Sequence, residues 1–395
     1  MKTRQRVFIG ILFIILILIG INYFARPFEK YFDVKEMTVQ KTIEPIEPVV
    51  LSSFDIVQKL SSKEKIAQMI ATPLVIDEEI TNESSKSATF SAVNLETGFF
   101  TIFGNNISFD SAKLKITEVE RLYKDNLLSP KFAVDHEGGK VQRLNGDGFT
   151  VIPSWRKLCV NEDIEEFKKI LKTSAQELRD VGIDIVLAPV LDVGNSQVLK
   201  DRICSDSYPV VAERSLEYII VFDSYGILPV IKHFPGLGQV TKDLHTNFDF
   251  VKVLDNDVKL YTYIIGESPH VGVMISHAGV LNQNPEIPCS LSTDCVGELK
   301  NAYPELLIFS DALEMKSASF DKDNSDEEKD LLKVSREAVV AGNEVLIYGP
   351  TVTMQELENI TNDLSITYDN DVVFKKLVDE AVLKIVNYKY TGSRI

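Results

Sequence analysis

The residues best suited to chemistry lie between positions 230 and 245. Lys232 and His233 follow an apolar run, and a Pro-Gly turn separates them from Asp243 and His245. In a turned loop, a carboxylate two residues before an imidazole can accept a hydrogen bond from one ring nitrogen, which fixes the tautomer and favours the protonated ring. Such a couple can serve as general acid and base. A D-x-H triplet by itself is common in ordinary surface loops, so this interpretation needs support from other residues.

Other polar residues stand directly after apolar runs elsewhere in the chain. Asp135, His277 and Asp311 each follow a different run. In a parallel α/β barrel the carboxyl ends of all strands meet at one rim, where active sites are built. We therefore expect these residues to converge with Lys232 and His233. The simpler interpretation of Asp311 is an N-cap of the next helix.

Two arginines stand in loops that can reach the same rim. Glu137 and the pair Gly138-Gly139 predict a tight turn that brings Arg143 back over the rim, although a structural salt bridge would fit the same residues. Arg202 follows the fourth apolar run in a long loop, where a lone arginine is usually solvated.

The elements that must position these residues alternate in a regular way. Short apolar runs, read as buried parallel strands, are separated by amphipathic segments with helical spacing, among them 162–181 and 331–341. This pattern, with polar residues after several runs, favours a single TIM-type (β/α)8 barrel over a doubly wound open sheet. The polar segments 77–91 and 317–329 are expected to be solvated surface loops. The expected strands are 68–72, 98–103, 131–134, 184–188, 228–231, 271–275, 306–309 and 344–348.

Composition and charge limit the class of protein. The chain has 395 residues, of which 45% are hydrophobic and 25% charged, which is typical of a globular protein. Its net charge of −16 disfavours a nucleic-acid partner, because it would repel phosphate. The four cysteines fit no zinc pattern and allow three disulfide connectivities, while buried free thiols fit equally well. Nothing in the sequence indicates a metal ion or a cofactor.

The N-terminus differs from the rest of the chain. Residues 1–6 are basic and precede the apolar segment 7–25, which is close to the roughly 20 residues that cross a bilayer. We expect an uncleaved membrane anchor that leaves residues 1–6 in the cytoplasm and the remainder outside, with a cleaved signal as the alternative. Residues 26–51 are interpreted as a linker and residues 52–395 as one catalytic barrel.

Taken together, five motifs resemble glycoside hydrolase family 3, in particular its single-domain bacterial β-N-acetylglucosaminidases. The resemblance covers roughly residues 60–390. The motifs are D-H-E-G-G-K-V-Q-R (135–143), A-P-V-L-D-V (188–193), K-H-F-P-G-L-G with D-L-H (232–245), M-I-S-H (274–277) and S-D-A-L-E-M (310–315).

The resemblance implies a retaining β-N-acetylhexosaminidase that acts on terminal β-N-acetylglucosaminides, with peptidoglycan fragments as natural substrates. Asp311 would be the nucleophile that forms a covalent glycosyl-enzyme, and His245, oriented by Asp243, the acid and base. A β-glucosidase or β-xylosidase of the same family and a catalytically weak cell-wall sugar-binding protein are the alternatives. The residues implied to hold the sugar are Asp135, Arg143, Arg202, Lys232 and His233.

The chain departs from the family pattern at three places. Leu237 stands where the family usually has histidine, and Leu244 replaces the usual serine or threonine of D-S-H. Of the family's D-R-S-F-G segment only Asp201-Arg202 is kept. These changes surround the expected site without removing a proposed catalytic group, so they bear on sugar specificity.

Overall fold

The computed structural model describes residues 51–76, 95–161, 163–268, 270–320 and 330–391, which form one compact unit. The expected cytoplasmic N-terminus (1–6), the expected anchor (7–25) and nearly all of the expected linker lie outside the described residues. Within the described ranges, no helix combines the length and apolar character needed to cross a membrane.

Eight parallel strands form the centre of the unit, and their order in the sheet follows their order in the chain. β1 pairs with β12, and a parallel bridge between Phe309 and Val345 joins β11 to the residue before β12. The result is a nearly closed α/β barrel, as predicted, and not an open doubly wound sheet. All eight expected runs contain a strand. The strands are β1 (Ile70–Val75), β2 (Phe99–Phe103), β3 (Lys131–Val134), β6 (Ile185–Val186), β7 (Leu228–Phe234), β9 (Gly272–Ile275), β11 (Leu307–Ser310) and β12 (Leu346–Ile347).

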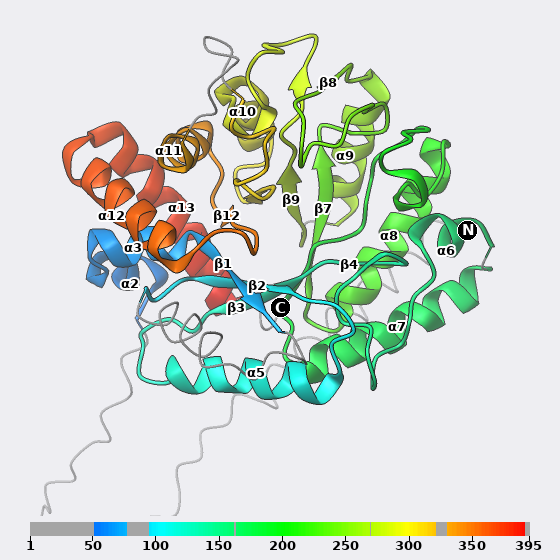
Figure 1. Cartoon of the computed structure of the whole chain (residues 1–395), viewed down its shortest axis with the longest axis horizontal. Coiled ribbons are helices and arrows are strands. Elements are labelled where there is room, and N and C mark those ends of the chain that lie inside the picture. The colour runs from blue at the N-terminus through cyan, green and yellow to red at the C-terminus, as the bar shows by residue number, and fades with distance from the viewer. Residues whose placement is uncertain (1–50, 77–94, 162, 269, 321–329, 392–395) are drawn as a thin grey trace, which may run out of the picture. The chain divides into compact units, whose positions relative to one another are not determined.

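Helices surround the strands (Figure 1). The first two described helices, α2 and α3, pack against the last two, α12 and α13, so the two ends of the unit meet. The helices are α2 (Ser53–Lys59), α3 (Ser62–Gln68), α5 (Phe109–Leu122), α6 (Trp155–Asn161), α7 (Ile164–Val181), α8 (Tyr208–Ser224), α9 (Asp255–Glu267), α10 (Thr293–Ala302), α11 (Leu331–Ala341), α12 (Met354–Asn370) and α13 (Val372–Thr391).

Short elements sit in the loops at the carboxyl ends of the strands. β4 (His136–Gly138) and β5 (Val141–Gln142) form an antiparallel hairpin, and β8 (Phe250–Val251) pairs in parallel with β10 (Gly279–Val280). Two 3-10 turns, η1 (Lys200–Arg202) and η2 (Cys289–Leu291), follow β6 and β10.

The two helices predicted from sequence have clear local end signals. The side chain of Asp163 caps the first turn of α7, and Gly182 ends that helix with a φ of 108°. Asp330 and Gly342 do the same for α11. A short polar side chain satisfies free N–H groups at a helix start, and glycine adopts the left-handed conformation at little cost. Asp311 therefore caps neither of these helices, and its interpretation as the N-cap of the next described helix is wrong.

Alternation along the strands places the site residues. Successive strand residues point to opposite faces, so in a barrel every second side chain enters the lumen. On β3, Ala133 belongs to one apolar cluster while Phe132 and Val134 belong to the other, which packs against helices α5, α7 and α8. The same alternation separates Phe309 from Ile308 on β11. Continued past the strand ends, it gives Asp135 and Asp311 lumen positions at the carboxyl rim.

Two other expectations change with the structure. The four cysteines form two disulfides, Cys159–Cys204 and Cys289–Cys295, so the free-thiol interpretation is wrong. Segment 317–329 is not wholly a solvated loop, because Ser317 is fully buried. Residues 321–329 and all of segment 77–91 lie outside the described residues.

Candidate active site

Lys232 links two carboxylates at the rim. Its Nζ atom lies 2.8 Å from Oδ1 of Asp135 and 2.6 Å from Oε1 of Glu137. Lys232 is buried, and burial alone would lower its pKa, but the two negative charges outweigh this effect and the pKa is raised. The ammonium group is therefore held charged. Its partner Asp135 lies 97 residues earlier in the chain.

Arg202 binds the other side of Glu137. Its Nε and Nη2 atoms donate to the two carboxylate oxygens at 2.8 and 2.9 Å, a bidentate geometry that is strong for a charged pair. Burial alone would raise the pKa of Glu137, but the charges of Arg202 and Lys232 hold it well below its usual range. Arg202 is thus part of a buried ion-pair network and not a solvated loop residue.

His233 is fixed by Asp192 and Arg202. Its Nδ1 lies 2.7 Å from Oδ2 of Asp192, and its Nε2 lies 3.1 Å from Nη2 of Arg202. A guanidinium only donates hydrogen bonds, so Nε2 accepts and the ring proton is on Nδ1, where it can be donated to Asp192. Asp192 also accepts from the backbone N–H of Leu237 at 2.6 Å, which ties the loop after β7 to the same carboxylate.

Two glycines allow these loops to touch. A Cβ on Gly238 would overlap the carbonyl oxygen of Val193, and a Cβ on Gly194, which has a φ of 146°, would overlap the carbonyl oxygen of Gly238. Only glycine fits such close approach and such a φ. The second glycine of the P-G-L-G segment therefore lets Asp192 and His233 lie side by side.

Asp311 lies at the end of β11, partly buried. Its Oδ1 accepts the backbone N–H of Ala312 at 2.8 Å. Burial alone would raise its pKa, but the nearby His277, His233 and His245 and the Ala312 hydrogen bond outweigh burial, so the pKa is lowered. Asp311 is therefore an ionised carboxylate, as a nucleophile requires.

The Asp243–His245 couple forms as predicted. Nδ1 of His245 lies 2.9 Å from Oδ1 of Asp243, and that oxygen also accepts the His245 backbone N–H at 3.0 Å. Both side chains are exposed, 69% for His245 and 55% for Asp243. Backbone hydrogen bonds from Lys316 to His245 and from Ser317 to Leu244 join this loop to the one that follows Asp311.

Arg143 returns to the rim through the predicted turn. Gly138 and Gly139 take φ values of 94° and 60° between β4 and β5. The backbone N–H of Arg143 donates to the Asp135 carbonyl at 3.2 Å, and its Nη2 lies 3.7 Å from Oδ2 of Asp135. The side chain is about one-third exposed, so it can still turn toward a ligand.

The two leucines that depart from the family pattern are buried. Leu237 is 4% exposed and Leu244 5% exposed, and both belong to the larger apolar cluster. They therefore anchor the loop that carries Asp243 and His245 to the protein core.

The structure brings all eight predicted site residues to one end of the barrel, in two groups. Asp135, Arg143, Arg202, Lys232 and His233 form the ion-pair network, and Asp243, His245 and Asp311 lie on the two joined loops. Sequence reasoning placed His277 at the rim without assigning it a role, and it gave no site role to Glu137 or Asp192. Their signal was their place inside the D-H-E-G-G, A-P-V-L-D-V and M-I-S-H motifs, but their partners are distant in sequence. Over the described ranges, no three His, Cys, Asp or Glu residues are grouped so as to hold a metal ion.

Comparison with known sequences gives the family. A family model described as the glycosyl hydrolase family 3 N terminal domain matches residues 61–387. A β-hexosaminidase of Psychromonas ingrahamii is 31% identical over 261 residues, which cover 63% of this chain and 76% of the relative. The β-hexosaminidase LpqI of Mycobacterium tuberculosis is 31% identical over 175 residues, 42% of this chain and 45% of the relative.

Solved structures have the same fold. A β-N-acetylhexosaminidase from Beutenbergia cavernae aligns with a TM-score of 0.72 at 22% identity, over 84% of this chain and 99% of that one. M. tuberculosis LpqI aligns with a TM-score of 0.72 at 24% identity, over 86% and 96%.

The barrel and the family match define the class of protein, a glycoside hydrolase. Within that class, the chain belongs to glycosyl hydrolase family 3.

Proposed function

We propose that this enzyme is a retaining β-N-acetylhexosaminidase that hydrolyses terminal β-N-acetylglucosaminides. Asp311 is the nucleophile, and His245 with Asp243 is the acid and base. The observation that carries the proposal is the junction of two loops. The backbone of Lys316 and Ser317, in the loop after Asp311, bonds to the backbone of His245 and Leu244. The names of the relatives, β-hexosaminidase, support the choice of substrate.

In the first step, a carboxylate oxygen of Asp311 attacks the anomeric carbon. Protonated His245 donates its Nε2 proton to the glycosidic oxygen, so the aglycone leaves and a covalent glycosyl-enzyme forms. Asp243, 2.9 Å from Nδ1, stabilises the charged ring before transfer. Burial alone would raise the pKa of Asp311, but the nearby imidazoles lower it, and this keeps the nucleophile ionised.

In the second step, water replaces the aglycone. Neutral His245 accepts a proton from water at Nε2, the water oxygen attacks the anomeric carbon, and Asp311 leaves as a carboxylate. Each step inverts the anomeric centre, so the product keeps the β configuration. One imidazole serves both directions because the ring donates a proton in its charged form and accepts one in its neutral form.

The ion-pair network is suited to hold the sugar. Asp135 uses Oδ1 for Lys232, and its Oδ2, which lies 3.7 Å from Nη2 of Arg143, can still accept from a sugar hydroxyl. Arg202 binds Glu137 through Nε and Nη2, which leaves Nη1 to donate to a carbonyl such as that of an acetamido group. Arg143 and His233 complete the set of side chains proposed to contact the sugar.

We also propose that the barrel lies outside the cell membrane, tethered by residues 7–25, and acts on peptidoglycan fragments. The two disulfides support this setting, because disulfides persist in oxidising compartments and are rare in the cytosol. The substrate part of this proposal rests on the family resemblance.

Substrate choice tests the proposed function. Purified residues 52–395 are assayed with 4-nitrophenyl β-N-acetylglucosaminide, β-glucoside and β-xyloside. We expect kcat/KM for the N-acetylglucosaminide to exceed the other two by at least about 10²-fold, because a site that hydrogen-bonds the acetamido group penalises its loss. Preference for the glucoside or xyloside would support the alternative enzyme. Binding of N-acetylglucosamine by folded protein that turns over none of the three would support a sugar-binding protein.

A further inference from the structure

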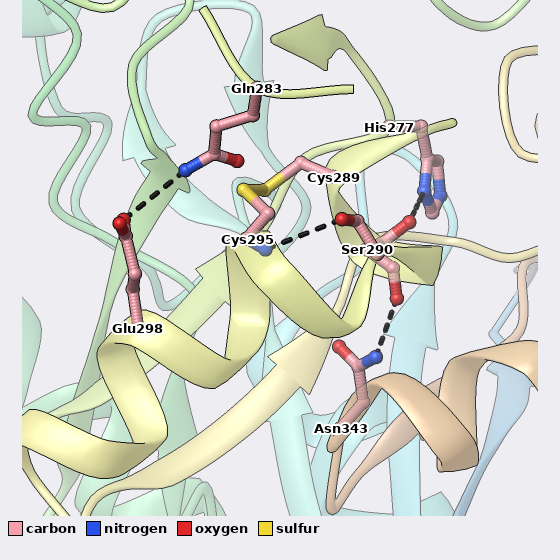
Figure 2. Close-up of a disulfide and its surroundings, with 8 residues drawn as sticks. His277, Gln283, Cys289, Ser290, Cys295, Glu298 and Asn343 are labelled. Atoms are coloured by element: carbon pink, nitrogen blue, oxygen red, sulfur yellow. Dashed lines mark hydrogen bonds between the residues drawn. A yellow bond between two sulfur atoms is a disulfide. The ribbon is translucent and has the colours of Figure 1, made fainter. Parts of the chain in front are cut away.

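A buried histidine lies next to the proposed nucleophile without a role in either chemical step. His277 follows β9 and is completely buried. Its Nδ1 lies 2.6 Å from Oγ of Ser290, and its Nε2 lies 2.9 Å from the carbonyl oxygen of Ala312. Figure 2 shows the ring facing Ser290, beside a disulfide.

These two partners fix the tautomer of His277. A carbonyl oxygen only accepts, so Nε2 carries a proton. Burial lowers the pKa of His277 although the charge of Asp311 acts against it, which favours the neutral ring. Nδ1 then has a free electron pair, and the Ser290 hydroxyl donates to it.

The contact with Ala312 acts on the backbone of the nucleophile. The N–H of Asp311 donates to the Ile275 carbonyl at 3.0 Å, and the N–H of Ala312 donates to the Asp311 carboxylate at 2.8 Å. His277 holds the carbonyl at the other end of Ala312. Three hydrogen bonds thus fix the turn that carries the carboxylate.

Ser290 is itself tightly held (Figure 2). Its N–H donates to the Ser276 carbonyl at 3.0 Å, and its carbonyl accepts from Nδ2 of Asn343 at 2.7 Å. The preceding residue, Cys289, is bonded through its disulfide to Cys295 on α10. The hydroxyl therefore has a fixed direction, which a solvated serine would lack.

We propose that His277 is a positioning residue for the nucleophile Asp311, and that Ser290, held beside the Cys289–Cys295 disulfide, sets its tautomer. The proposal rests on the proposed role of Asp311. Losing the Nε2 hydrogen bond frees the Ala312 peptide, and a displacement of about 1 Å at a reacting group can cost about 10²-fold in rate. Sugar binding uses other residues, so the loss falls on kcat.

Matched variants of the full chain test the contact. His277→Leu removes the donor, whereas His277→Gln keeps an N–H that can reach the Ala312 carbonyl. We expect kcat to fall by about 10²-fold in His277→Leu with KM within about threefold, and His277→Gln to recover at least about tenfold of the loss. His270→Gln, at an exposed histidine beside Asp223, is the control and should match wild type. Folded His277→Leu with wild-type kcat, or His277→Gln no better than His277→Leu, would overturn the proposal.

Histidine NMR tests the tautomer without activity and covers the case in which His277→Leu fails to fold. The chain has five histidines, so the ¹⁵N-histidine spectrum is simple, and the signal lost in His277→Gln identifies the ring. We expect a neutral Nε2–H ring in the wild-type chain and a mixture of tautomers in Ser290→Ala, with Ser290→Thr restoring the single form. A wild-type ring that is charged or protonated on Nδ1 would overturn the proposal.

The two proposals fail in different ways. Kinetics use whichever β-glycoside the wild-type chain turns over, so a wrong substrate assignment leaves the His277 comparison intact. An inactive wild-type chain would overturn both the function and the role of His277, whereas an active chain insensitive to His277→Leu overturns only the latter.

Discussion

Glu137 offers a sharp test of the ion-pair network. It is almost fully buried. Its carboxylate oxygens accept hydrogen bonds from Nε and Nη2 of Arg202 at 2.8 and 2.9 Å, and Oε1 lies 2.6 Å from Nζ of Lys232. Glu137→Gln keeps the shape but leaves Arg202 facing a neutral amide and leaves Lys232 with Asp135 as its remaining carboxylate partner. Removing one partner of a buried ion pair costs about 3–5 kcal/mol. We expect a loss of that size in the free energy of unfolding and a KM at least about tenfold higher, because Arg202 loses its carboxylate partner and Lys232 loses one of two.

The stabilisation that Glu137 gives the folded state depends on pH with a defined sign. Burial raises the pKa of Glu137, but its cationic partners lower it further, so the folded-state pKa lies well below the ordinary glutamate value. Below about pH 4.5 the unfolded chain binds a proton that the folded chain does not. The stabilisation is therefore complete above that pH and is lost as pH falls, by up to about 1.4 kcal/mol per pH unit. Glu137→Gln should lose this dependence.

Urea unfolding measures the loss in the free energy of unfolding and its pH dependence. The chain has one tryptophan, Trp155, which is buried and reports unfolding by fluorescence. Glu166→Gln breaks an exposed pair with Lys169 and is the matched control, with an expected change within about 0.5 kcal/mol. A Glu137→Gln variant within about 1 kcal/mol of wild type at pH 7, or a gap that stays constant down to about pH 3.5, would refute this account of the network.

Two further predictions concern the acid/base loop and the sugar side. His245→Ala should slow hydrolysis of an alkyl N-acetylglucosaminide by about 10²–10⁴-fold. It should spare the glycosylation step of a dinitrophenyl N-acetylglucosaminide, because that leaving group needs no proton. Equal losses on both substrates, measured by pre-steady-state kinetics, would contradict the acid role. Replacing both Cys159 and Cys204 by alanine should raise KM more than it lowers kcat, because Cys204 stands just after Arg202, and should lower stability by about 3–4 kcal/mol, since the disulfide closes a 45-residue loop. An unchanged KM in that folded variant would contradict the link to Arg202.

Much of the fold follows from local patterns in the sequence. The apolar run 131–134 is β3 without change, and the amphipathic segments before Gly182 and Gly342 are α7 and α11. Several elements that the sequence did not predict are short. β8 and β10 have two residues each and exist because Phe250 and Gly279 meet across a loop. A two-residue strand leaves no periodicity to detect.

Site residues at strand ends could be predicted from the sequence. Site residues whose role depends on a partner far away in the chain could not. Asp135, Lys232 and Asp311 were found because each follows an apolar run. Glu137 was taken only as part of a turn, since its pairing with Arg202 spans 65 residues. Asp192 likewise meets His233 across 41 residues. Such pairs are set by the closure of the barrel, which no local pattern encodes.

The central claim is that Asp311 forms a covalent bond to the sugar, and a trapped intermediate tests it most directly. The chain is incubated with 5-fluoro-N-acetylglucosaminyl fluoride, for which formation of the glycosyl-enzyme is faster than its hydrolysis. The protein is then digested and mapped by mass spectrometry. The account predicts one added N-acetyl-5-fluoroglucosaminyl group, located on Asp311 and absent from Asp311→Asn. A label on another residue, or turnover by Asp311→Asn at the wild-type rate, would contradict it.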